Sequence, residues 1–374
     1  MSLVVVDPTY RGTEHAPINA AFTQLLTPGA SCIATTPAMF RAMVAIDPSA
    51  PLPAHEVIDV LPSGGVTLRR MRVQWRVLSA LVVQHKATAL LLLSAGPETL
   101  FVARALTTRH PGLRIHAIMH NMSDMAGWRS RDPRRRWIDM RAGLRWADHP
   151  AITLVVLEDY IAAAARDGGS DWRGIWRGVA NRMQVWPHPT LAQEQPKLAP
   201  WTPGARLRLT IAGRASRDKG FDTILALAAA SPQHDWSVTG RLDPPYDAAP
   251  PMPSAAERLS RPDYLTALRR ADYAVVAHQP AYDLTASGSI LDCATNRIPV
   301  IALRSPAVTA LSAHYGPLGP IVPDAEAALA LLDSPALRDT AAYSAYQRSL
   351  EALHQSRTIA ALAPLIRGDL GLAR

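Results

Sequence analysis

Short apolar segments alternate with longer amphipathic segments along almost the whole of this 374-residue chain. A run of four to six apolar residues has the length of a buried strand, and the stretches between such runs carry the three-to-four-residue spacing of helices. Strands that alternate with helices pair in parallel, because each helix carries the chain back to the starting edge of the sheet. The sequence therefore predicts an α/β protein built on parallel sheets.

Residues 1–187 carry the first series of these segments. The predicted strands are Leu3–Val6, Ser31–Ala34, Val57–Leu61, Ala89–Leu93, Arg114–Met119, Thr153–Leu157 and Met183–Trp186. Helical patterns lie between them, most regularly over Leu68–Gln84, Glu98–Arg109 and Pro133–Trp146. This part of the chain is expected to form an N-terminal Rossmann-like domain that binds the acceptor.

Residues 188–205 interrupt the alternation with a stretch rich in Pro, Gln and Ala, as in an interdomain linker. The second series, over 206–340, has predicted strands Arg208–Ala212, Trp236–Thr239, Tyr273–Ala277 and Pro299–Leu303, and predicted helices Asp218–Ala230, Pro262–Arg270 and Ser287–Thr295. The helices of 341–374 are expected to pack back on the first domain. A chain of this length exceeds the usual size of a single core, so two doubly wound domains facing a cleft are predicted.

Composition excludes several classes of protein. Hydrophobic residues make up 48% of the chain and charged residues 19%, which is incompatible with a disordered protein. The only cysteines, Cys32 and Cys293, have no partner spacing for a disulfide framework or a zinc site. The N-terminus lacks the features of a signal peptide, and the apolar run Ala87–Ala95 is too short to span a bilayer. A cytoplasmic location is expected.

The formal net charge of +8 is concentrated in part in the segment 128–146, where arginines and tryptophans crowd together. Such a segment fits the anionic inner face of a cell membrane, with peripheral attachment. It is also compatible with nucleic-acid phosphates or with an ordinary solvated helix face. No nucleic-acid partner is expected, but the composition alone leaves these alternatives open.

Two motifs in the second half point to phosphate binding. Arg214 and Lys219 follow a predicted strand, so their cations are expected at the carboxyl edge of the sheet, where they can neutralise a diphosphate. Ser287-Gly288-Ser289 opens a predicted helix, whose N–H groups and small side chains let a phosphate approach closely. Asp292, one turn further on, is a candidate contact for a ribose or a nucleobase.

Candidate catalytic groups follow the predicted strands of the first half. A transfer that inverts the sugar needs a base to deprotonate the acceptor hydroxyl, and the chain offers histidines and carboxylates for that role. The candidates are His120, Asp124, Glu14, His15 and Asp7, and the pattern does not choose among them. Asn121 and His188 are expected to contact the donor sugar or its phosphates.

Several familiar motifs are absent from the sequence. No Asp-x-Asp triplet occurs, so a manganese-bridged diphosphate is not indicated, and no metal site or cofactor is expected. No Gly-x-Gly-x-x-Gly follows the first strand, and neither a Walker lysine motif nor a Gly-x-Ser-x-Gly elbow is present.

Three segments of the second half together resemble the GT-B glycosyltransferases, in particular bacterial polysaccharide enzymes related to glycosyltransferase family 4. They are Gly213-Arg214 with Lys219-Gly220, the Asp263–Ala277 helix–strand pair, and Ser287–Ala302. In that family two glutamates lie seven residues apart. Asp292 matches the second, whereas Thr285 stands in place of the first, and Arg297-Ile-Pro-Val-Ile-Ala matches the ending.

The Ser287-Gly288-Ser289 variant is more similar to the xanthan-type β-mannosyltransferase, which also has a His-Asn after a first-domain strand and a nearby Gly-Trp. Here these are His120-Asn121 and Gly127-Trp128. The resemblance implies a metal-independent transfer of a hexose, with GDP-mannose as the favoured donor, to a hydroxyl of a glycan or polyprenyl-linked glycan in bacterial polysaccharide synthesis. Two other readings stay open: a sugar-nucleotide epimerase, and an arginine-rich nucleic-acid-binding protein.

Overall fold

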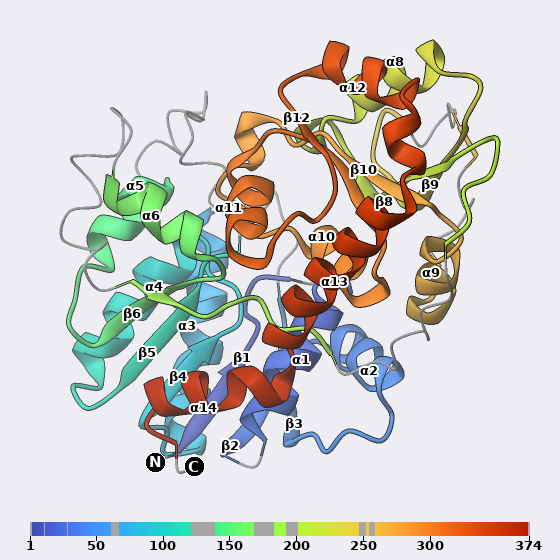
Figure 1. The fold of residues 1–374 in the computed structure, drawn as a ribbon. Helices are drawn as coiled ribbons and strands as arrows, with labels where there is room; N and C mark the ends of the chain where they lie inside the picture. The colour runs from blue at the N-terminus through green and yellow to red at the C-terminus, as the bar shows by residue number, and fades with distance from the viewer. Residues whose placement is uncertain are drawn as a thin grey trace. The chain divides into compact units, whose positions relative to one another are not determined.

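A computed structural model of the chain describes residues 2–10, 12–27, 29–60, 67–120, 139–167, 183–191, 201–246, 252–253 and 259–372. The predicted α/β class with parallel sheets is confirmed (Figure 1). The chain divides into two compact units. The first comprises Met1–Leu191, Leu284–Ala286 and Arg357–Arg374, and the second comprises Ala192–Asp283 and Ser287–Ser356.

The first unit is built on a seven-stranded sheet in the order β3-β2-β1-β4-β5-β6-β7, in which all neighbours are parallel. Its strands are β1 (Leu3–Val6), β2 (Ala30–Thr35), β3 (Ala54–Val57), β4 (Ala89–Leu92), β5 (Arg114–Ile118), β6 (Ile152–Val156) and β7 (Gln184–Val185). Successive residues of β1 face opposite cores, Val4 and Val6 on one side and Leu3 and Val5 on the other. Both faces of the sheet are therefore buried.

Helices supply the two covering layers of this sheet. Side chains of α3 (Thr67–Gln84), α4 (Pro97–Arg109), α5 (Met140–Trp146) and α6 (Asp159–Asp167) pack in the core with Val4 and Val6. Side chains of α1 (Ala16–Leu26), α2 (Pro37–Ile46) and the C-terminal α14 (Ile359–Asp369) pack in the core with Leu3 and Val5. The N-terminal strand is thus an inner strand of the sheet, with helices over both of its faces.

The second unit has a five-stranded sheet in the order β12-β11-β10-β8-β9, again with every neighbour parallel. Its strands are β8 (Arg208–Ala215), β9 (Asp235–Leu242), β10 (Tyr273–Val276), β11 (Val300–Leu303) and β12 (Ile321–Val322). The helices are α8 (Phe221–Ala230), α9 (Arg261–Leu268), α10 (Gly288–Asn296), α11 (Pro306–Tyr315), α12 (Ala325–Leu332) and α13 (Thr340–Ser356), with short 3-10 turns at Arg217–Lys219, Pro280–Tyr282 and Pro335–Arg338.

Two predicted elements differ from the structure. The third strand is Ala54–Val57 rather than Val57–Leu61, and Ile58 and Val60 are buried core residues of the loop that follows it. The helix predicted from Asp218 is divided at Gly220, which adopts a φ of 73°. A Cβ at Gly220 would lie 1.9 Å from the Ala277 carbonyl oxygen, so only glycine fits between this turn and the end of β10.

Each sheet has one point at which the order of the strands reverses. In the first unit β1 is followed by β2 and β3 on one side, whereas β4 pairs on its other side. In the second unit the reversal falls between β8 and β10. The loops that leave such a pair of strands diverge at their carboxyl ends, and open parallel sheets bind ligands in the resulting crevice. This geometry selects two places to look for a site.

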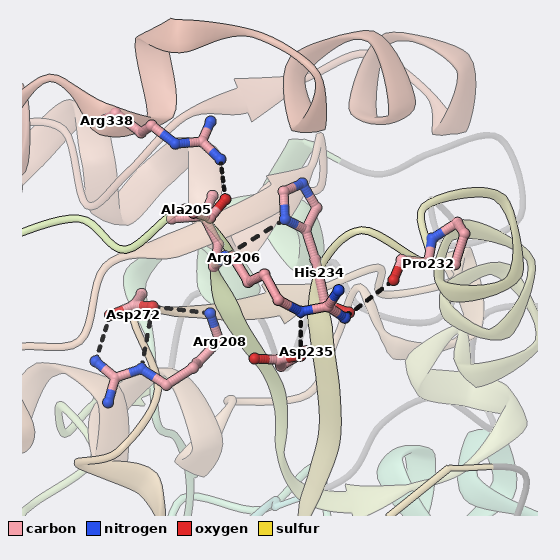
Figure 2. A network of polar contacts seen from close by, with 9 residues as sticks. Ala205, Arg206, Arg208, Pro232, His234, Asp235, Asp272 and Arg338 are labelled. Carbon is pink, nitrogen blue, oxygen red and sulfur yellow. Dashed lines mark hydrogen bonds and ion pairs between the residues drawn. The ribbon is translucent and has the colours of Figure 1, made fainter.

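The opposite, amino end of β8 is held by a buried carboxylate. Asp272, which is 1% exposed, accepts hydrogen bonds from the Arg208 backbone nitrogen at 2.8 Å and from Arg208 Nη2 at 2.7 Å (Figure 2). It also accepts one from Trp201 Nε1 at 3.0 Å. Nearby, Arg206 Nε donates to Asp235 Oδ1 at 2.7 Å, but both of those side chains are more than half exposed. The two pairs therefore differ in burial although they share the same chemistry.

We expect Asp272→Ala to lower the free energy of unfolding by about 1–3 kcal/mol, because it leaves the Trp201 and Arg208 donors without their acceptor. Asp235→Ala is the matched control and should cost less than about 1 kcal/mol, because an exposed ion pair is screened by water. Urea-induced unfolding of the full chain, followed by circular dichroism, measures both. Equal losses for the two variants would contradict this account of the network.

Candidate functional site

The strand reversal of the second unit carries the Arg214 and Lys219 motif. Gly213, whose φ is 79°, and Arg214 both lie in the last three residues of β8. Arg214 Nη2 lies 2.9 Å from Asp218 Oδ2, and its Nη1 lies 3.2 Å from Asp243 Oδ2. The charge of Arg214 is thus already offset by two carboxylates. A cation without a carboxylate partner must come from another residue of this loop.

Lys219 has a different environment. Its Nζ donates to Ser289 Oγ at 3.3 Å and lies 5.6 Å from the centroid of the Tyr282 ring. Within the described ranges no carboxylate comes within ion-pair distance of this ammonium group. A Cβ at Gly213 would lie 3.7 Å from Lys219 Nζ, so the missing side chain leaves the ammonium open toward the backbone of β8.

The start of α10 presents hydroxyl groups to the same place. Ser287 Oγ lies 3.1 Å from Ser289 Oγ, and the Ser287 side chain does not cap the helix that begins at Gly288. Lys219 thus adjoins a pair of hydroxyl groups at a helix N-terminus. A helix N-terminus, a cation and hydroxyl donors together favour an anion such as a phosphate.

Two residues beside these hydroxyl groups, His278 and Tyr282, were given no role from the sequence. His278 follows β10, and its Nε2 lies 3.5 Å from Ser287 Oγ. Its ring packs against Tyr282 with centroids 4.4 Å apart. Burial, together with the charge of Lys219, lowers the pKa of His278 to about 3, so the ring is neutral. A polar residue directly after a buried strand was the available signal, the same one that marked His120.

Asp292, the predicted nucleoside contact, lies one turn inside α10 and is held by α9. It accepts a hydrogen bond from Tyr264 Oη at 2.9 Å and forms an ion pair with Arg261. These partners fix the position of the carboxylate. The structure therefore brings Lys219, Ser287, Gly288 and Ser289 together, with Asp292 farther along the same helix.

In the first unit, Asp7 directly follows β1 and is fully buried. Its Oδ1 accepts from the backbone nitrogens of Thr9 and Tyr10, each at 3.2 Å, and from Ser94 Oγ at 2.5 Å. Its Oδ2 accepts from Asn19 Nδ2 at 2.7 Å. A carboxylate with four donors organises the loops after β1 and β4 and has little capacity left to take a proton from a substrate.

The predicted histidines His15, His120 and His188 lie near one another, and His120 is also close to Asp7. The His15 ring stacks on Tyr10 at 3.7 Å and meets the His120 ring edge-on at 4.6 Å. His120 Nε2 lies 2.6 Å from the Leu93 carbonyl oxygen, which can only accept, so Nε2 carries the proton and Nδ1 is the basic nitrogen. The backbone nitrogen of His188 donates to the Leu157 carbonyl oxygen at 3.0 Å.

The rings of His15 and His120 favour their neutral form. Burial, and secondarily the neighbouring His188, lowers the pKa of His15 to about 4. Burial, with His15 and His188 nearby, also holds the pKa of His120 well below its usual value. Glu14 is exposed in the turn before α1. The remaining candidates of this unit, Asn121 and Asp124, lie outside the described residues.

Metal clusters and membrane-spanning helices are both absent from the part of the chain that the structure describes. Within it, no three or more histidine, cysteine or acidic side chains are grouped so that they could hold a metal ion. No helix there is both long enough and apolar enough to cross a bilayer.

Solved structures resemble this chain over nearly its full length. Sucrose-phosphate synthase of Thermosynechococcus elongatus has a TM-score of 0.71 and 16% identity, covering 99% of this chain and 98% of that one. HepE of Anabaena in complex with UDP-glucose has a TM-score of 0.71 and 11% identity, covering 99% of each chain. UDP-GlcNAc 2-epimerase of Neisseria meningitidis bound to UDP-GlcNAc has a TM-score of 0.55 and 12% identity, covering 99% of each.

No family model and no curated protein sequence matches the chain. The structural likeness nevertheless establishes the fold. The chain has the GT-B fold, with two Rossmann-like domains, as predicted.

The neutral state of His15 has a consequence for stability. Its pKa is about 6.5 in the unfolded chain and about 4 in the folded protein, so unfolding takes up a proton as the pH falls below 6.5. The wild type should therefore lose free energy of unfolding when the pH falls from 7 to 5. In His15→Gln this loss should be smaller by about 1–2 kcal/mol. Urea titrations of the wild type and the variant at both pH values measure this. An unchanged pH dependence would show that His15 titrates normally.

Proposed function

We propose that this protein is a glycosyltransferase that transfers a hexose from a nucleotide-diphosphate sugar to a hydroxyl of a glycan or lipid-linked glycan, in bacterial polysaccharide synthesis. The observation that carries the proposal is the placement of the Lys219 ammonium beside Ser289 and the start of α10, with hydroxyl and aromatic neighbours in place of carboxylates. The GT-B neighbour HepE holds UDP and UDP-glucose in its solved structures, which supports a nucleotide sugar as ligand.

The chemistry of transfer explains why such a place is useful. Breaking the bond between the sugar and the diphosphate puts negative charge on the leaving oxygen, and a cation held at that point stabilises the transition state. In this proposal Lys219 supplies that charge without a metal ion, and Ser287, Gly288 and Ser289 hold the phosphates. Arg214 joins them by exchanging an ion-pair partner, and Asp292 contacts the nucleoside.

In the first unit we assign the acceptor contacts to His120 and His15. Nδ1 of His120 is the side of that ring free of the proton, so it can accept a hydrogen bond from a hydroxyl. Glu14 and Asp124 are the carboxylates proposed to take the proton of the acceptor, with Asn121 and His188 as further contacts to the sugar or its phosphates. GDP-mannose is the favoured donor on the resemblance of the motifs.

We expect a panel of GDP-, UDP-, dTDP- and CMP-sugars to contain at least one that raises the melting temperature by mass action. Lys219→Ala should raise the dissociation constant of that ligand about 10–100-fold, because a charge-assisted hydrogen bond is worth roughly 1.5–3 kcal/mol. Arg217→Ala is the matched control, since this cation lies in the same turn with its side chain 80% exposed. Calorimetric titration in EDTA measures both variants and tests metal independence.

An epimerase of the same fold is the second candidate, since one of the structural neighbours is a UDP-GlcNAc 2-epimerase. Incubation of the protein with the bound donor alone separates the two. A transferase leaves the configuration of the donor unchanged, whereas rapid epimerisation without an acceptor would overturn the transferase proposal. If no nucleotide sugar binds at all, both the transferase proposal and the role assigned to Lys219 are wrong.

A peripheral contact with an anionic membrane also belongs to the proposal. Helix α3 has no acidic residue, and its outward residues combine exposed Arg72 and Arg76 with Trp75, which is 36% exposed, and Val83, which is 67% exposed. Basic and apolar residues on one helix face suit an anionic lipid surface. Trp146 at the end of α5 is also exposed, whereas 128–138 of the arginine-rich segment lie outside the described residues.

The full chain should therefore co-sediment with phosphatidylcholine vesicles that contain phosphatidylglycerol, and much less with pure phosphatidylcholine. Replacing Arg72 and Arg76 by glutamine should weaken binding at least about tenfold, since each basic residue near the surface contributes roughly 1 kcal/mol. Arg348→Gln, on the exposed face of α13, is the control. Equal binding to both kinds of vesicle, or no effect of the α3 substitutions, argues against this surface.

A further inference from the structure

A narrow pocket lies at the carboxyl edge of the first unit's sheet, where the strand order reverses between β1 and β4. The space in it, counted together with open solvent at its mouth, is about 340 Å³. Pro8 and Thr9 line it from the loop after β1, Asp59 from the loop after β3, and Glu98 from the first turn of α4. Helix α3 contributes Arg70 and Gln74. None of these residues belongs to the sites assigned above.

Gln74 has an unmatched acceptor in this pocket. The side chain is only 8% exposed, and its Nε2 donates to the Pro8 carbonyl oxygen at 3.1 Å, which fixes the orientation of the amide. Oε1 is buried and has no hydrogen-bond partner among the described residues. Buried polar atoms in native proteins are nearly always paired, so an orphaned acceptor on a residue that lines a pocket indicates a donor that arrives from outside.

Arg70 presents the complementary group. Its Nη2 forms an ion pair with Glu98 Oε1 at 3.1 Å, whereas its Nε is buried and has no partner within the described part of the chain. The pocket therefore offers one orphaned acceptor and one orphaned donor. A hydroxyl group both donates and accepts, so neighbouring hydroxyls on a ring can satisfy both atoms at once.

The charges of the pocket restrict the ligand further. Arg70 and Glu98 offset each other, which leaves the carboxylate of Asp59 at the rim as the net charge. A second carboxylate on the ligand would be repelled there, whereas sugar hydroxyls can donate to Asp59. The narrow space suits the hydroxyl-bearing edge of a ring better than an entire disaccharide.

From these observations we propose that the pocket is an acceptor subsite that binds adjacent hydroxyls of an uncharged hexose residue. The inference rests on the proposed transferase function, and it names the class of acceptor. Gln74 Oε1 accepts from one hydroxyl, Arg70 Nε donates to a second, and Asp59 accepts at the rim. The loop after β1 and Ser94 share the Asp7 hydrogen bonds, which ties the pocket to the β4 end where Leu93 holds His120.

Saturation-transfer NMR on the full chain, saturated with GDP, the nucleotide of the favoured donor, tests the proposal with methyl glycosides of glucose, galactose and mannose as probes. At least one hexoside should bind, and methyl glucuronoside should bind about tenfold more weakly because of Asp59. Gln74→Met should weaken the binding of the hexoside about tenfold, since it removes the orphaned acceptor while keeping the volume of the side chain. Asp59→Asn should narrow the preference for the hexoside over the glucuronoside.

Glu326→Gln, an exposed carboxylate of the second unit, is the matched control and should change neither ligand. Because Asp59 is exposed, its substitution tests the pocket even if Gln74→Met fails to fold. Absence of hexoside binding, equal binding of the glucuronoside, or indifference to both substitutions would overturn the proposal. Nucleotide-sugar binding measured on the same variants should be unchanged. If donors bind and hexosides do not, only the acceptor subsite fails, whereas hexoside binding without any donor would sink the transferase function alone.

Discussion

The parallel pairing of the strands governs everything else in this molecule. A parallel neighbour requires a crossover helix, and helices on both sides bury both faces of each sheet. Polar residues that could bind a ligand are consequently expected mainly around the loops at the carboxyl ends of the strands. The reversals between β1 and β4 and between β8 and β10 then open the only places in each sheet where successive loops diverge. Lys219 and His278 follow β8 and β10, the two strands of the second reversal.

Hydrogen-bond saturation distinguishes supporting groups from candidate ligand contacts. Asp7 accepts four hydrogen bonds and Asp272 is similarly enclosed, so both carboxylates are committed to holding loops and strand ends. Gln74 Oε1 and Arg70 Nε, by contrast, are buried without a partner in the described part of the chain. An unsatisfied buried atom lowers stability, so its retention in a pocket is most simply explained by a ligand that completes it.

Much of the fold was predictable because strands buried on both faces appear in the sequence as unbroken apolar runs. Leu3–Val6 was placed without error, and the strands that start at Arg208 and Tyr273 were found at the right residue. The edge strand Ala54–Val57 was missed because its residues are only partly buried, while the apolar Ile58 and Val60 beyond it belong to a loop. Gly220 was read as helix because a left-handed residue leaves no mark in periodicity. The pairing of Arg214 with Asp243 joins residues far apart in the sequence, which no local pattern reveals.

The histidines illustrate how the structure changes the meaning of a motif. His120 was proposed from its place after a strand, where it could either orient a hydroxyl or remove its proton. A general base works best when its pKa lies near the working pH. Burial holds the pKa of His120 well below that of a free imidazole, and the Leu93 carbonyl fixes its proton on Nε2. The same burial that makes Nδ1 a well-placed acceptor therefore makes it a weak base. Of the two roles proposed for His120, the burial of its ring therefore favours orienting a hydroxyl over removing its proton.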